Sequence, residues 1–104
     1  MPSPTAPVLV PRVETTPEAR LAPQYRVLIH NDDVTPMDFV VGVLRGIFRL
    51  SFMRSTEVMF EAHFKGVAHV VTEPLERAEF HVDQARSLAR ARKYPLTFTV
   101  ERED

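Results

Sequence analysis

Proline placement constrains the fold of this chain more than any other feature. Six of its nine prolines fall within the first 23 residues. Because proline lacks a backbone donor and fixes φ, that stretch cannot form a helix or an inner strand. We therefore predict a flexible, proline-rich arm over residues 1–23 and a single folded domain over residues 24–104. A chain of 104 residues leaves no room for a second domain.

Composition excludes several classes of function. The chain is 44% hydrophobic and 26% charged, which is typical of a globular protein. A net charge of −1 argues against nucleic acid or a membrane surface as the partner. The absence of cysteine excludes disulfides, a thiol nucleophile and a Cys-based zinc site. No apolar run approaches the roughly 20 residues of a membrane helix, and the N-terminus lacks a secretory signal pattern. We expect a cytoplasmic monomer that needs no cofactor or metal.

Turn and cap residues divide the first half of the domain. Residues 25–30, YRVLIH, are rich in β-formers and predict a strand. The sequence then predicts a helix with Thr35 as its N-cap and Pro36 as its first residue. Ser51 is expected to cap a second helix, and Gly66 is placed to end it.

The second half of the domain continues with two strands and one helix. Residues 67–72 predict a strand, a third helix begins near Pro74, and residues 96–100 alternate like a half-buried strand. The predicted order is β-α-α-β-α-β. Three short strands cannot enclose a core, so the helices should cover one face of a three-stranded antiparallel sheet. The fold class is an α/β sandwich with a disordered N-terminal arm.

Polar side chains are crowded where the first strand meets the first helix. Asn31, Asp32 and Asp33 follow His30 directly. Asn and Asp favour turns, so a purely structural loop is one interpretation. Carboxylates with His30 and His63 also allow a metal site or acid/base catalysis, although no HExxH or EF-hand spacing is present. No nucleophile lies beside a base, and there is no glycine-rich phosphate loop. A small Asp/His metal-dependent hydrolase remains the alternative to a binding protein.

Three segments of the chain resemble the ClpS family of protease adaptors. They are YRVLIHNDDVTPMDFVVGVL, then EVMFEAHFKGVA, and the helix that ends before YPL. The resemblance implies a protein without catalytic activity that is bound by a ClpA/ClpC-type AAA+ unfoldase working with ClpP. It also implies capture of N-degron substrates, whose N-terminal residue is a bulky hydrophobic one such as Phe, Leu, Tyr or Trp.

The polar residues fit recognition of a free N-terminus. An ammonium has donors and no acceptor, so a specific site needs acceptors that converge on it. Asn31, Asp32 and His63 are the predicted acceptors, while Asp33 is expected to support the turn. Acetylation of the amine would remove its charge and leave these acceptors unpaired.

The resemblance also assigns the walls of a side-chain pocket. These residues are Thr35, Met37, Val40, Met59, Ala62 and Leu96. Methionine suits such a pocket because its flexible thioether adapts to different apolar side chains. Ala62 stands where the family usually has a larger aliphatic residue, so we expect a roomier pocket that favours large aromatic residues. By the same resemblance, Glu76 is expected to contact the unfoldase.

Overall fold

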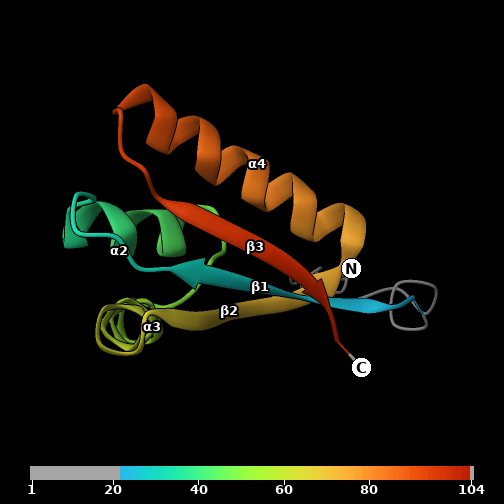
Figure 1. Ribbon diagram of the computed structural model, residues 1–104. Coiled ribbons are helices and arrows are strands. Elements are labelled where there is room, and N and C mark those ends of the chain that lie inside the picture. Colours follow the sequence, from blue (N-terminus) through green and yellow to red (C-terminus); the bar gives the residue numbers. More distant parts are fainter. Residues whose placement is uncertain (1–21, 104) are drawn as a thin grey trace, which may run out of the picture.

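The elements follow one another in the predicted β-α-α-β-α-β order (Figure 1). The computed structural model describes residues 22–103, so residues 1–21 of the predicted arm lie outside it. The elements are β1 (Gln24–His30), α2 (Met37–Gly46), α3 (Phe52–Lys65), β2 (Val67–Pro74), α4 (Leu75–Ala91) and β3 (Thr97–Arg102). No helix within residues 22–103 combines the length and the apolar character needed to cross a membrane.

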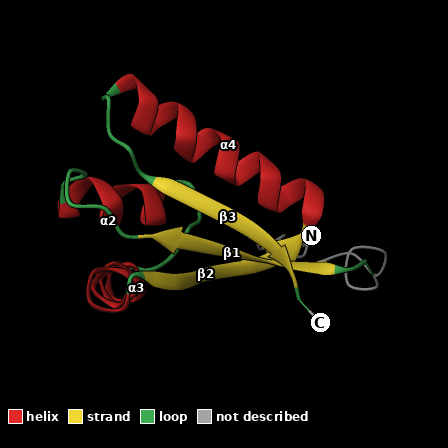
Figure 2. Cartoon of the chain, in the orientation of Figure 1, coloured by secondary structure: helices red, strands yellow, loops and turns green. Residues whose placement is uncertain are grey.

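The three strands form one antiparallel sheet with β1 at its centre. The strand order is β2-β1-β3, and both neighbours run antiparallel to β1 (Figure 2). His30, the last residue of β1, is paired with Val67 on one side and with Thr97 on the other. The carboxyl end of β1 therefore lies between the start of β2 and the start of β3.

One face of this sheet carries the hydrophobic core. Val27 and Ile29 of β1 are buried, whereas the alternate residues Arg26, Leu28 and His30 are partly exposed. All three helices contribute to a single buried cluster with the strands. In Figure 1, α4 runs along the sheet, while α2 and α3 lie together near the carboxyl end of β1. The prediction that the helices cover one face of an antiparallel sheet is confirmed.

The caps of α3 agree with the sequence, and the start of α2 does not. Ser51 Oγ accepts a hydrogen bond from the Arg54 N–H at 3.0 Å, and Gly66 ends the helix with φ 90°. The N-cap of α2 is Pro36 in an extended conformation, without a side-chain cap. The prediction of Thr35 as the N-cap is therefore wrong. The physical reason is that the Thr35 hydroxyl and N–H both donate to Asp32, three residues earlier.

Candidate functional site

A pocket lies at the carboxyl end of β1, where pairing of the strands assembles residues that are distant in sequence. The Asn31 N–H donates to the Gly66 carbonyl oxygen at 3.0 Å, which ties the residue after β1 to the end of α3. His63, one turn before Gly66, is thereby brought to the same end of the strand. On the other side, Leu96 directly precedes Thr97, the partner of His30 in β3. α2 follows the loop and completes the wall.

All nine residues predicted to bind substrate line this pocket, whose volume is about 300 Å³. That volume is at the low end of the roughly 300–1,000 Å³ of small-molecule sites. The further lining residues are Ile29, His30, Asp33, Val34 and Pro36. Its size suits one amino-acid side chain better than a larger ligand.

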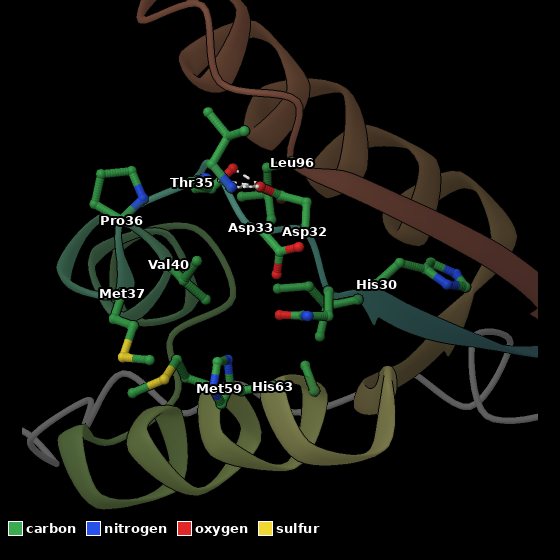
Figure 3. Close-up of a pocket in the computed structure, with 14 residues that line it drawn as sticks. His30, Asp32, Asp33, Thr35, Pro36, Met37, Val40, Met59, His63 and Leu96 are labelled. Carbon is green, nitrogen blue, oxygen red and sulfur yellow. Dashed lines mark hydrogen bonds between the residues drawn. The ribbon is translucent and has the colours of Figure 1, made fainter.

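The inner wall of the pocket is apolar and comes from three elements. Val40 of α2, Met59 and Ala62 of α3, and Leu96 before β3 are all buried. Met37, at the start of α2, is 44% exposed and lies at the mouth. Figure 3 shows Met37 and Met59 projecting into the space between α2 and α3. An apolar group that enters this space is removed from water by side chains that are already packed into the core.

The carboxylate of Asp32 holds the loop above the pocket. Its Oδ1 accepts hydrogen bonds from the N–H groups of Val34 at 2.8 Å and Thr35 at 2.6 Å. Its Oδ2 accepts from the Thr35 hydroxyl at 2.8 Å. A carboxylate that accepts from the N–H groups two and three residues later is an Asx turn, stabilised here by the threonine hydroxyl.

Three other polar side chains lack partners among residues 22–103. No side-chain hydrogen bond to a described residue is made by the Asp33 carboxylate, the Asn31 amide or the His63 ring. The His63 ring contacts the Phe64 ring edge-on, with 5.0 Å between the ring centroids. Figure 3 shows the Asp33 carboxylate turned away from Thr35 and towards α3, the helix that carries His63. These groups leave a carboxylate, an amide and an imidazole available at the mouth of an apolar pocket.

Asp33 is the residue whose place at the site the sequence interpretation missed, because it was expected only to support the turn. The spacing of Asp32 and Thr35 is the signal that distinguishes the two aspartates. An Asp followed three residues later by Thr can form the Asx turn with the hydroxyl bond seen here. Once Asp32 is committed to that turn, Asp33 is the carboxylate left for another partner.

Metal binding has little support in this arrangement. Within the described part of the chain, no three His, Cys, Asp or Glu residues are grouped so that they could hold a metal ion. His30 lines the pocket, but its ring is turned away from the pocket in Figure 3, and its Nε2 lies 2.7 Å from the Thr99 hydroxyl on the other face of the sheet.

Comparisons with known proteins agree on one family. The profile described as ClpS, ATP-dependent Clp protease adaptor protein, matches residues 20–99. The chain is 43% identical over 90 residues to the ATP-dependent Clp protease adapter protein ClpS of Roseobacter denitrificans, covering 86% of this chain and 80% of that relative. It is 38% identical over 101 residues to ClpS 2 of Mesorhizobium japonicum, covering 91% of this chain and all of the relative, 100%.

A solved structure is also similar to this chain. The structure of Agrobacterium tumefaciens ClpS2 bound to L-phenylalaninamide matches with a TM-score of 0.75 and 40% identity, covering 78% of this chain and 98% of that one. None of these relatives supports a metal-dependent hydrolase. The family profile matches most of the domain, and the identity extends over 80% to 100% of the two relatives, so this chain belongs to the ClpS family of ATP-dependent Clp protease adaptor proteins.

Proposed function

We propose that this protein captures substrates by their free N-terminal amine and bulky hydrophobic N-terminal side chain, and delivers them to a ClpA/ClpC-type AAA+ unfoldase of a ClpP protease. The observation that carries the proposal is the pairing of unpartnered acceptors with an apolar pocket at one end of β1. L-phenylalaninamide, the ligand of the similar Agrobacterium protein, has a free amine and a phenyl ring. These two groups match the acceptors and the apolar wall.

The amine binds to the three side chains that have no hydrogen-bond partner among residues 22–103. Asn31 offers an amide oxygen, Asp33 a carboxylate and His63 a ring nitrogen. Each hydrogen bond to the charged amine is worth about 1.5–3 kcal/mol. Asp32 holds the loop in place, and its direct contact with the amine stays a prediction. Because the acceptors need the positive charge and the donors of the amine, an acetylated N-terminus is rejected.

The side chain of the first residue enters the space bounded by Val40, Met59, Ala62 and Leu96, with Thr35 and Met37 at the mouth. Burial of one Phe or Leu side chain contributes about 1.5–3 kcal/mol. Together with the amine contacts, and after the cost of association, this predicts a dissociation constant on the order of micromolar. Such an affinity suits a transient delivery step.

The unfoldase contacts a surface away from the pocket. Glu76 lies in the first turn of α4, which follows Pro74, and Pro74 is paired with the first residue of β1. The pocket lies at the other end of β1, a strand length of roughly 20 Å away. In Figure 1, α4 begins at the end of the sheet opposite to α2 and α3. Substrate and unfoldase can therefore be bound together by a cytoplasmic monomer that performs no catalysis.

Fluorescence anisotropy with a labelled Phe-initiated peptide tests the proposal. His63→Ala and Asn31→Ala should each weaken binding about tenfold or more, since each removes one charge-assisted hydrogen bond. Phe80→Ser is the matched control, because Phe80 is 60% exposed on α4 and does not line the pocket. Wild-type affinity in both pocket variants, with circular dichroism showing intact folds, would refute this site.

A further inference from the structure

Helix α3 has a second apolar surface that does not face the core. Met53, Phe60 and Phe64 are 75%, 43% and 77% exposed, whereas Val58 and Ala62 of the same helix are buried. Spacings of seven and four residues place these three side chains on one stripe of the helix. We call them the α3 stripe. Its two phenylalanines stack on each other, with 6.1 Å between the ring centroids.

The α3 stripe is continuous with the pocket. Successive helix residues are rotated by about 100°, so His63 lies about 40° and Phe60 about 100° from Met59 around the helix axis. His63 therefore separates the pocket wall from the stripe. The His63 ring contacts the Phe64 ring edge-on at 5.0 Å, and Phe64 stacks on Phe60. A series of ring contacts thus leads from His63, at the mouth of the pocket, onto the outer surface of α3.

We propose that the α3 stripe binds the substrate segment directly after the N-terminal residue, and that it selects for apolar side chains at substrate positions 2 and 4. This inference rests on the proposed function, because only a chain anchored in the pocket is presented to the stripe. Once the amine and first side chain are held, the next residues must leave across the mouth, each advancing by at most about 3.6 Å. Positions 2 to 4 are therefore those within reach of Phe64 and Phe60.

The spacing of the two rings fits an extended chain. Side chains two residues apart in an extended peptide point to the same side and are about 6.6–6.8 Å apart. The ring centroids of Phe60 and Phe64 are 6.1 Å apart. An extended substrate segment can therefore place the side chains of positions 2 and 4 against successive rings. Because the stacked rings offer no hydrogen-bond acceptor, the contact selects for apolar character rather than for one residue type.

Three ligands distinguish binding by the α3 stripe from binding by the pocket. L-phenylalaninamide has no residue beyond the first, Phe-Ser-Gly-Ser has polar positions 2 and 4, and Phe-Leu-Gly-Leu has apolar ones. Their affinities for wild type, Phe60→Ser and Phe64→Ser are compared by isothermal titration calorimetry. Phe80→Ser is the control, since it removes from α4 a phenylalanine whose exposed fraction, 60%, lies between those of Phe60 and Phe64.

The expected result is that wild type binds Phe-Leu-Gly-Leu about tenfold more tightly than Phe-Ser-Gly-Ser, a difference of about 1.4 kcal/mol. Phe60→Ser and Phe64→Ser should each reduce that ratio to about twofold or less, while L-phenylalaninamide binds them as it binds wild type. Phe80→Ser should retain the full ratio.

Two outcomes overturn the inference in different ways. Equal affinity of wild type for both tetrapeptides, with L-phenylalaninamide still bound, removes the stripe from substrate recognition and leaves the pocket intact. A tenfold preference that survives both stripe variants but is lost in Val34→Ser places the exit of the substrate chain beside Val34, which also lines the pocket, and likewise overturns the inference. Absence of binding by all three ligands would instead refute the proposed function, and the inference with it.

Discussion

Exchanging the two neighbouring aspartates for alanine should produce opposite defects. Asp32→Ala removes the acceptor of three hydrogen bonds of 2.8, 2.6 and 2.8 Å that hold the loop. Asp33→Ala removes an exposed carboxylate that makes no hydrogen bond within the described residues. We expect the first variant to lose stability and the second to lose affinity for N-terminal amines.

The magnitudes follow from these contacts. Loss of a capping Asp costs about 0.5–2 kcal/mol, and Asp32 accepts three hydrogen bonds where a simple cap accepts one, so we expect about 2 kcal/mol. For a domain of this size that corresponds to a fall in melting temperature of roughly 8–16 °C. Asp33→Ala should change stability by less than about 0.5 kcal/mol. Its lost bond to the amine, about 1.5–3 kcal/mol, should weaken peptide binding roughly 10- to 150-fold.

The assay combines thermal unfolding, followed by circular dichroism, with anisotropy titration of a Phe-initiated peptide at a temperature where every variant is folded. Asp32→Asn is the matched control, because its amide oxygen can still accept from the two backbone N–H groups. Asp32→Asn should retain most of the stability that Asp32→Ala loses. The reasoning is refuted if Asp32→Ala melts like wild type and loses peptide affinity while Asp33→Ala binds normally, since the two roles would then be reversed.

Three further substitutions test other parts of the structure. Ser55 is fully buried in α3, and its Oγ has no partner within residues 22–103. Ser55→Ala should therefore raise the melting temperature by a few degrees in differential scanning calorimetry; a fall would reveal an unseen partner. Gly66 has φ 90°, and a Cβ added there would meet open space. Gly66→Ala should therefore lower the free energy of unfolding in urea by about 1–2 kcal/mol through backbone strain alone. An unchanged urea midpoint would contradict this. Ala62→Val adds two methyl groups to the pocket. In peptide titrations it should shift the ratio of the affinities for Leu-initiated and Trp-initiated peptides towards Leu by about three- to tenfold. An unaltered ratio would rule out the predicted effect of Ala62.

The order of the elements could be predicted from the sequence because local signals mark their ends. Ser51 and Gly66 have the conformations expected of an N-cap and a C-terminal glycine, and the strands differ from the predicted ranges only at their ends. These signals depend on a few neighbouring residues. The start of α2 was mistaken because two local interactions compete: Thr35 can cap a helix, but Asp32 engages both its N–H and its hydroxyl.

The assembly of the pocket could not be derived from local signals. Asn31, His63 and Leu96 lie far apart in the sequence, and they meet because His30 is paired with Val67 and with Thr97. Strand register is a property of the whole sheet, so periodicity along the chain does not reveal it. The resemblance to the ClpS family supplied these residues, and all of them line the pocket. The spacing of Asp32 and Thr35 allows an Asx turn, and the loop conformation shows that Asp32 makes it.

In the proposed function, the pocket binds a free amine and a bulky apolar side chain as one unit. Isothermal titration with Phe-initiated and Ser-initiated peptides, each with a free and an acetylated N-terminus, tests it most directly. Dissociation constants on the order of micromolar are expected only for the free Phe-initiated peptide, with at least about a hundredfold weakening on acetylation or on replacement of Phe by Ser. Equal affinity for the free and acetylated Phe peptides would contradict the claim, because it would mean that Asn31, Asp33 and His63 do not recognise the amine.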